Sequence, residues 1–262
     1  TFTPNQDNFR NRVAMVCYEE TLDNDTTTYN HATHYSYDIH GNVKTLLQDN
    51  KDLTANTSTA SQRFKRLDYF YDLVSGNVNK VSYQTGESDQ WHHKYSYDAD
   101  NRIKEVLVSD NNLTWSNEAR YFYYDHGPLA RIELSDNNVQ GTDYAYTLQG
   151  WLKNVNSDAL YTANDMGQDA TGTGANSLFA HDAVGFSLHY HNNDYQPIAA
   201  ANFTNNSLPV STLAGSDVFN NSFELFNGNI RAMVTTIKKP EIYTATTPSP
   251  TPNPLPQATA YK

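Results

Sequence analysis

Residues 35–43 read Tyr-Ser-Tyr-Asp-Ile-His-Gly-Asn-Val, and this stretch decides the fold. Two tyrosines at positions i and i+2 lie on the same face of a β-strand. The aspartate that follows them favours a tight turn, because its carboxylate accepts backbone N–H groups two residues ahead. Gly41 and Asn42 tolerate the positive φ that such a turn requires. The stretch therefore predicts a strand, a turn and the start of an antiparallel second strand at Val43.

The same order of aromatic pair, aspartate, turn and apolar strand recurs along the chain. With the second aromatic residue as the reference, the copies fall at positions 37, 71, 97, 124 and 146, and the fifth copy carries Thr147 in place of aspartate. This spacing suits two strands and two turns per copy, and five copies make a repeat protein. The residues predicted to form the structural repeat motif are Tyr35, Tyr37, Asp38, Gly41, Asn42, Tyr69, Tyr71, Asp72, Gly76, Asn77, Tyr95, Tyr97, Asp98, Asn101, Arg102, Tyr124, Asp125, Gly127, Tyr146, Gly150 and Trp151.

Return strands are expected after the turns, for example over residues 103–108 and 129–134. A single hairpin cannot bury its apolar face, so successive hairpins must join edge to edge into one antiparallel sheet. Tyrosines at equivalent positions would then form a ladder of rings across neighbouring strands. The prediction is an all-β protein made of antiparallel strand-turn-strand repeats.

Composition agrees with this fold class and excludes several functions. Tyrosine occurs 19 times, and abundant tyrosine favours half-buried strands. The net charge of −11 argues against nucleic-acid binding and against an anionic membrane surface, since both need clustered Lys and Arg. The mean hydropathy of −0.71, with no long apolar run, argues against a membrane-spanning helix.

Cys17 is the single cysteine, which excludes a disulfide framework and any zinc site built from several thiolates. A lone cysteine in a β-rich chain is usually buried and inert. The chain opens with Thr1-Phe2-Thr3-Pro4, without a methionine or a recognisable signal peptide. We therefore expect a segment of a longer chain.

The repeated motif resembles the YD repeats of the RHS family, which also supply the shells of Tc-toxin complexes. The family pattern is Tyr-x-Tyr-Asp-x-x-Gly-Asn/Arg-Ile/Leu/Val, and residues 35–43 fit it throughout. Residues 148–153 and 184–190 are similar to segments of RHS proteins of the Bacteroidetes type. The resemblance implies that the sheet is wound into a spiral and forms part of a hollow shell, or cocoon, around a C-terminal toxin or other cargo.

From this resemblance the expected function is structural: a shell segment of a large exported protein, extracellular or on a bacterial cell surface, with no enzymatic activity. The expected partners are the remaining YD repeats of the same chain, an enclosed C-terminal toxin domain, and export machinery or a surface protein. No nucleic acid and no membrane insertion are expected. The alternative is a cell-surface adhesion module that contacts glycans or a partner protein through aromatic faces.

Five segments are predicted along the chain. Residues 1–28 form a leading strand and loop, and residues 29–157 form the YD-repeat sheet. Residues 158–237 carry degenerate repeats with long surface loops, including a surface loop at 165–176 and a strand at 230–237. Residues 238–260 form a Pro/Thr-rich insertion or spacer, because six of the ten prolines lie between Pro240 and Pro256. Residues 261–262 begin a further, truncated repeat.

For single residues, metal binding and catalysis are weaker hypotheses than a structural role. Histidine pairs such as His189 and His191 could bind zinc only with further ligands, so strand packing is the better interpretation, and no metal or cofactor is expected. The aspartates at equivalent repeat positions indicate turn geometry and not a catalytic carboxylate pair. No catalytic residue is predicted.

Overall fold

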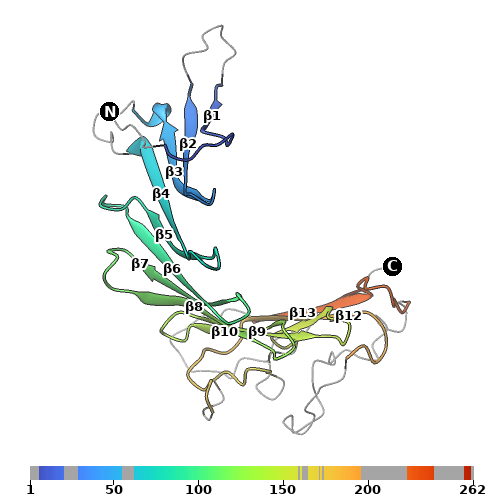
Figure 1. The fold of residues 1–262 in the computed structure, drawn as a ribbon. Coiled ribbons are helices and arrows are strands. Elements are labelled where there is room, and N and C mark those ends of the chain that lie inside the picture. Colours follow the sequence, from blue (N-terminus) through green and yellow to red (C-terminus); the bar gives the residue numbers. More distant parts are fainter. Residues whose placement is uncertain are drawn as a thin grey trace. The chain divides into compact units, whose positions relative to one another are not determined.

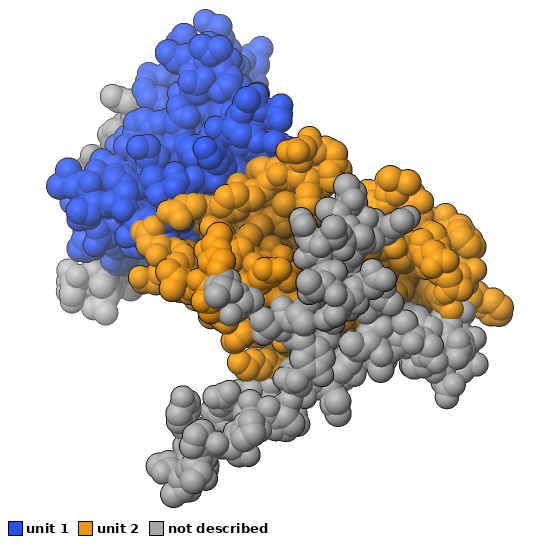
Figure 2. Space-filling view, turned by 90° about the horizontal axis from the view of Figure 1, so that it is seen from below, with its two compact units in different colours: residues 1–118 blue, residues 119–262 orange. Residues whose placement is uncertain are grey.

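The computed structural model describes residues 6–20, 29–54, 62–158, 160, 165–170, 172, 174–195, 223–238 and 257–260. The chain divides into two compact units, residues 1–118 and residues 119–262, coloured separately in Figure 2. Both units are built from antiparallel β-strands, which confirms the predicted all-β fold. Within these residues no helix has the length and apolar character needed to cross a membrane.

In each unit the order of strands in the sheet is their order along the chain (Figure 1). Unit 1 contains β1 (Met15–Tyr18), β2 (His31–Tyr37), β3 (Val43–Asn50), the 3₁₀ turn η1 (Lys51–Thr54), β4 (Phe64–Tyr71), β5 (Val78–Tyr83), β6 (Trp91–Tyr97) and β7 (Ile103–Ser109). β8 (Ser116–Tyr123) starts at the boundary between the units. Unit 2 continues with β9 (Leu129–Leu134), β10 (Gln140–Tyr146), β11 (Leu152–Val155), β12 (Val184–His189), β13 (Ala232–Ile237) and β14 (Gln257–Ala260).

Five hairpins share one irregularity, a register shift immediately before the turn. The shift falls between Ser36/Tyr37, Phe70/Tyr71, Ser96/Tyr97, Phe122/Tyr123 and Ala145/Tyr146. A β-bulge of this kind adds one residue to a strand and re-aims the side chain beside it. The repeat therefore places one tyrosine of each motif in a special position at the end of its strand.

The core of unit 1 is narrow and partly polar. Leu47 on β3 is 2% exposed, and Val106 and Val108 on β7 are buried. The His92 ring is fully buried and its Nδ1 lies 2.9 Å from the Ser82 hydroxyl on β5. On β3 the buried positions Leu47 and Asp49 lie on either side of exposed Gln48, as expected for a strand that covers a core on one face.

The core of unit 2 is more polar still. Leu188, Ala232 and Val234 are buried on β12 and β13. Around them lie buried Lys, Arg, Asp, Asn and Ser side chains, which outnumber the buried apolar ones among the described residues. Buried polar groups must find hydrogen-bond partners, so this unit depends on a network of polar contacts.

The return strands predicted at 103–108 and 129–134 are confirmed as β7 and β9. The strand predicted at 230–237 begins two residues later, at Ala232. The predicted segment boundaries stay predictions. Within the range assigned to a spacer, Gln257–Ala260 forms β14 and pairs with β13. The Pro-rich stretch 248–254 and residues 261–262 lie outside the described residues.

Two expectations are wrong. Cys17 is exposed, because all four residues of the short strand β1 are exposed. The stretch at 165–176 is not simply a surface loop, because the Asp165 side chain is buried and Asp169 is fully buried. The carboxylates of Asp165 and Asp169 point inward, and the Asp165 carboxylate forms a turn with the backbone N–H groups of Gly167 and Asp169.

Candidate functional site: repeat turns and a buried charge cluster

The turn of the first repeat is organised by the carboxylate of Asp38. Its Oδ1 accepts hydrogen bonds from the backbone N–H groups of His40, Gly41 and Asn42 at 2.7–2.9 Å. The Asn42 side chain donates to Oδ2 at 3.0 Å. Burial alone would raise the pKa of Asp38, but these donors together lower it. The aspartate is thus a turn-forming residue that supplies an acceptor for three backbone N–H groups of the turn and for one side-chain amide.

The second and third turns repeat this arrangement. Asp72 accepts from the N–H groups of Val74 and Ser75, and Asp98 accepts from those of Asp100 and Arg102. The Arg102 guanidinium also donates to the Asp98 carboxylate at 2.7 Å. The left-handed position is filled by Gly41 and Gly76 in the first two turns and by Asn101, with φ of 61°, in the third.

In the fourth turn the motif lies one residue earlier than the sequence suggested. The N–H of Tyr124 donates to the Pro128 carbonyl, and the N–H of Gly127 donates to the Tyr124 carbonyl. In the first turn these two bonds involve Asp38, so Tyr124 occupies the aspartate position and Tyr123 the position of the second tyrosine. Asp125 is an exposed residue inside the turn.

In the fifth turn Thr147 occupies the aspartate position. Its hydroxyl accepts a hydrogen bond from the Trp151 N–H at 3.1 Å, and Gly150 has φ of 84°. A hydroxyl satisfies one donor where the carboxylate of Asp38 satisfies several, so this turn is the less constrained one. Tyr146 ends β10 directly before the turn.

A hydroxyl-to-carbonyl bond, which we term the tyrosine latch, joins a tyrosine to a backbone carbonyl earlier in the chain. In the first three motifs the donor is the second tyrosine, and Tyr190, directly after β12, makes the same kind of bond. The bonds run from Tyr37 to Val13 (2.8 Å), Tyr71 to Val43 (2.9 Å), Tyr97 to Val78 (2.8 Å) and Tyr190 to Leu152 (2.7 Å). Val43, Val78 and Leu152 are the first residues of β3, β5 and β11. The latch therefore supplies a partner to a backbone carbonyl at the start of a strand.

The latch partly replaces the predicted ladder of tyrosine rings. Tyr69 and Tyr71 stack within β4, with ring centroids 6.4 Å apart, and Tyr124 meets Tyr146 edge to face. Tyr124 uses its hydroxyl differently from the latch tyrosines, donating forward to the Tyr144 carbonyl at 2.7 Å. Burial raises the pKa of Tyr124 to about 12, so the hydroxyl remains a donor.

Replacement of Tyr71 by phenylalanine is expected to lower the free energy of unfolding by about 1 kcal/mol, because the Val43 carbonyl loses its partner while the ring remains. Tyr69→Phe is the matched control, because Tyr69 lies on the same strand and makes no hydroxyl bond among the described residues. It should change the stability by less than about 0.5 kcal/mol. Urea unfolding followed by tyrosine fluorescence measures both, and equal losses would contradict the latch.

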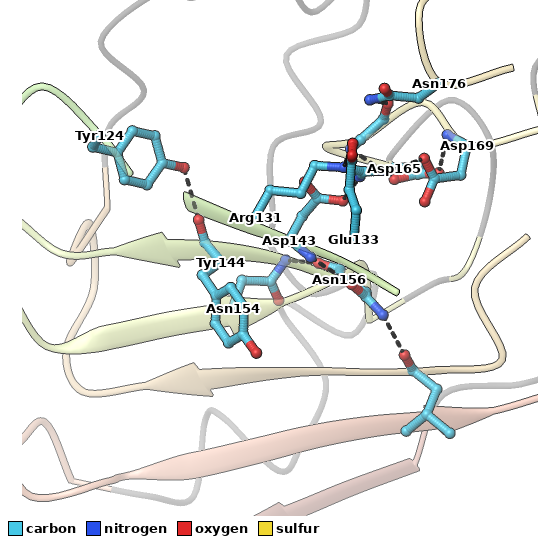
Figure 3. Close-up of polar contacts among 12 residues, drawn as sticks. Tyr124, Arg131, Glu133, Asp143, Tyr144, Asn154, Asn156, Asp165, Asp169 and Asn176 are labelled. Atoms are coloured by element: carbon cyan, nitrogen blue, oxygen red, sulfur yellow. Dashed lines mark hydrogen bonds and ion pairs between the residues drawn. The ribbon is translucent and has the colours of Figure 1, made fainter. Parts of the chain in front are cut away.

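Unit 2 holds a cluster of buried charges around Arg131 on β9 (Figure 3). The guanidinium donates to Asp143 at 2.6 Å, to Asp169 at 2.7 Å and to Glu133 at 3.1 Å. The Phe179 ring lies 4.8 Å from the guanidinium carbon. Glycine is required at positions 141 and 167, because a Cβ at either would overlap the guanidinium.

The carboxylate of Asp165 folds the segment that carries Asp169. It accepts the backbone N–H groups of Gly167 and Asp169, each at 2.8 Å. The Asn176 side chain then donates to the Gly167 carbonyl at 2.8 Å, joining two parts of the segment. These bonds hold Asp169 against Arg131.

Asp182 is the unusual member of the cluster. It is 5% exposed, and neither carboxylate oxygen has a hydrogen-bond partner among the residues that the structure describes. Burial, followed by the nearby charges of Asp165, Asp169 and Asp143, raises the pKa of Asp182 to about 8. Burial likewise raises the pKa of Asp143 to about 7, although Arg131 opposes the shift. A protonated carboxyl is the cheaper state for a buried group without a cation.

A second buried network links β11, β12 and the residues that follow β12. Lys153 forms an ion pair with Asp194 at 2.8 Å and lies 3.1 Å from Nδ1 of His189. Nε2 of His189 lies 2.9 Å from the Ser187 hydroxyl, which donates to Asp158 at 2.8 Å. Burial, together with Lys153, lowers the pKa of His189 to about 3, so the ring is neutral.

The Ser187–His189 pair does not form a nucleophilic site, because Ser187 is fully buried and its proton is directed at Asp158. Over the described ranges no group of three or more His, Cys, Asp or Glu is arranged to hold a metal ion. Both networks can hold strands together, and in the first the raised pKa values of Asp143 and Asp182 let these two carboxyls change protonation near neutral pH. Sequence reasoning missed them, although the even spacing of Asp165, Gly167 and Asp169 was a usable signal of a carboxylate-centred turn.

No protein-family model matches the chain, and no curated protein matches it. Among solved structures, it is similar to the crystal structure of TcdB2-TccC3 without the hypervariable C-terminal region, with 12% identity over 62% of this chain and 7% of that chain and a TM-score of 0.42. It is also similar to the Photorhabdus luminescens Tc holotoxin pore with the TccC3 mutation D651A, with 12% identity over 62% and 10% of the two chains and a TM-score of 0.26. For TcdB2-TccC3-Cdc42 the identity is 10% over 81% and 14%, with a TM-score of 0.24. The chain spans a small part of the length of each of these structures, and none of the similarities assigns it an activity.

Proposed function

We propose that this chain is a wall segment of an RHS-type shell that encloses or carries a C-terminal toxin or other cargo of a large exported protein. The role is mechanical: the strands form the wall, and the chain carries out no reaction. The further partners are the neighbouring YD repeats and the export machinery or a surface protein. The protein acts outside the cell or on its surface.

The observation that carries this proposal is the tyrosine latch. The latches of Tyr71 and Tyr97 make a hairpin depend on the strand before it, because these hydroxyls bond the carbonyls of Val43 on β3 and Val78 on β5. A hairpin that forms hydrogen bonds with the preceding strand can be repeated many times along a chain, as the repeats of solenoid proteins are. Three aspartate turns repeat the same geometry at one end of their hairpins, and the fourth and fifth turns keep the backbone bonds with Tyr124 and Thr147 in the aspartate position, so added repeats continue the sheet without a new type of contact.

The polar interior supports the same role. A wall that borders an enclosed space need not be apolar on its inner face, and the buried residues of both units are rich in Asp, Asn and Ser. Networks such as Lys153–Asp194 fix the strands by directed bonds where a thick apolar core is lacking.

The intact mass and the peptides of the protein from its natural source test the proposal. A chain much heavier than 29.6 kDa, with further Tyr-x-Tyr-Asp peptides on both sides of this segment, is expected. In limited proteolysis of that protein, the segment that follows the repeats should resist cleavage until the shell is denatured. A natural chain that consists of these 262 residues alone would contradict the shell.

Exposed aromatic residues favour a second candidate, the binding of glycans at a cell surface. Trp91 on β6 is 43% exposed and Phe70 on β4 is 47% exposed, and the Lys80 ammonium lies 4.4 Å from the Phe70 ring centroid. Aromatic faces of this kind stack on sugars. Binding to a glycan array that is lost in Trp91→Ala would favour adhesion, and the absence of binding would leave the shell as the function.

A further inference from the structure

Two stretches of unit 2, residues 165–170 and 174–182, pack against β9 and β10, and we call them the clamp segment. Its attachment to the sheet centres on Arg131, which bonds Asp169 at 2.7 Å and lies under the Phe179 ring. The Arg131 guanidinium also bonds Asp143 on β10, so one side chain joins β9, β10 and the clamp segment. Because the attachment of the clamp segment depends on this one cation, it is sensitive to the number of ionised carboxylates around Arg131.

The carboxylates around Arg131 outnumber it. Glu133 and Asp143 face it from the sheet, and Asp165, Asp169 and Asp182 belong to the clamp segment. Two further titratable residues, His181 and Lys238, adjoin the Asp182 region through the backbone and have exposed side chains. Arg131 forms ion pairs with Asp143 and Asp169. Asp182 forms no ion pair and no side-chain hydrogen bond among the described residues.

We propose that the protonation state of Asp182 controls the packing of the clamp segment. With the carboxyl protonated the segment stays packed on β9 and β10, and ionisation of that carboxyl releases the segment from the sheet. The geometry behind this is the 5% exposure of Asp182 and its two carboxylate oxygens, which have no hydrogen-bond partner among the described residues. Release exposes Phe179 and the Arg131 guanidinium, both of which are buried when the segment is packed.

The direction of the pH dependence follows from the raised pKa of the packed state. When the segment is released, Asp182 faces water and has an ordinary pKa near 3.8; when it is packed, the pKa is about 8. Packing therefore takes up a proton between these values, and packing weakens as the pH rises through this window. One proton changes the packing equilibrium by at most about tenfold per pH unit, and the effect levels off above the packed-state pKa.

Hydrogen exchange of the full chain between pH 5 and pH 9, corrected for intrinsic exchange, tests the proposal. In the wild type the protection of the amides at 165–170 and 174–182 should fall with rising pH. The Asp182→Asn side chain keeps the shape and cannot ionise. In this variant the amide protection should fall less steeply with pH, by up to about tenfold less per pH unit below pH 8. Asp125→Asn, at an exposed turn position of the same unit, should leave the wild-type slope unchanged.

A second measurement keeps the test independent of the stability of the variant. Carboxyl ¹³C NMR of the wild type, with the Asp182 signal assigned by its loss in Asp182→Asn, should give a titration well above pH 5. A midpoint near pH 4, or equal exchange slopes in the wild type and Asp182→Asn, would overturn the proposal. Neither result bears on whether the chain is part of a shell.

Discussion

Replacement of Arg131 by alanine is expected to lower the free energy of unfolding of unit 2 by about 3–5 kcal/mol, because removal of one partner leaves buried charges without compensation. Asp143 and Asp169 each lose an ion pair of 2.6–2.7 Å, and Asp169 has no exposure to water. The loss should be greater at pH 8 than at pH 5, because burial raises the pKa of Asp143 to about 7, and this carboxyl needs no cation once it is protonated.

Denaturant unfolding monitored through the amides of β9, β10 and β12 measures this loss. Arg120→Ala is the matched control, because Arg120 lies on β8, is 44% exposed and pairs with Asp136 at 3.6 Å. An exposed pair of this kind contributes less than about 1 kcal/mol. If Arg131→Ala costs no more than Arg120→Ala, the cluster does not hold the clamp segment in place.

Replacement of Leu47 by alanine is expected to destabilise unit 1 by about 2–5 kcal/mol, through lost burial and the cavity that remains. Leu47 is 2% exposed on β3, which pairs with β2 on one side and β4 on the other. The described core of this unit has few large apolar side chains, so its neighbours cannot rearrange to fill the cavity left by Leu47.

The midpoint of thermal unfolding, together with exchange of the β2, β3 and β4 amides, measures the effect. Leu73→Ala is the control, because Leu73 lies in the turn after β4 and is 81% exposed. It should change stability by less than about 0.5 kcal/mol. Similar midpoints for both variants would mean that Leu47 does not anchor the core of this unit.

The hairpins could be predicted from the sequence because their determinants are local. A tyrosine pair, an aspartate and a glycine or asparagine lie within nine residues at 35–43, and the turn uses bonds among those residues alone. The predicted return strands at β7 and β9 followed for the same reason.

The register of the fourth hairpin was missed because residues 121–125 read Tyr-Phe-Tyr-Tyr-Asp and admit two alignments. The glycine decides between them. Asp38 precedes Gly41 by three positions and Thr147 precedes Gly150 by three, and the same distance back from Gly127 leads to Tyr124. The positive φ of that glycine, and not the aspartate, fixes the turn.

The buried charges could not be predicted because their partners come from distant segments. Arg131 and Asp169 are 38 positions apart, and Lys153 and Asp194 are 41 apart. A stretch rich in Gly, Asp and Thr has the composition of a solvated loop. The local sequence around Asp169 does not indicate that its carboxylate will be buried in an ion pair with an arginine on a distant strand.

The agreement between strand order and chain order has a kinetic consequence. A strand in either unit finds its first partner in the strand synthesised just before it, so the sheet has low contact order and little loop entropy to overcome. Folding can then proceed from the N-terminal end, one hairpin at a time, without waiting for residues far ahead. A polypeptide of this design can leave a ribosome or a narrow secretion channel as an extended thread and become structured at the rate at which it emerges.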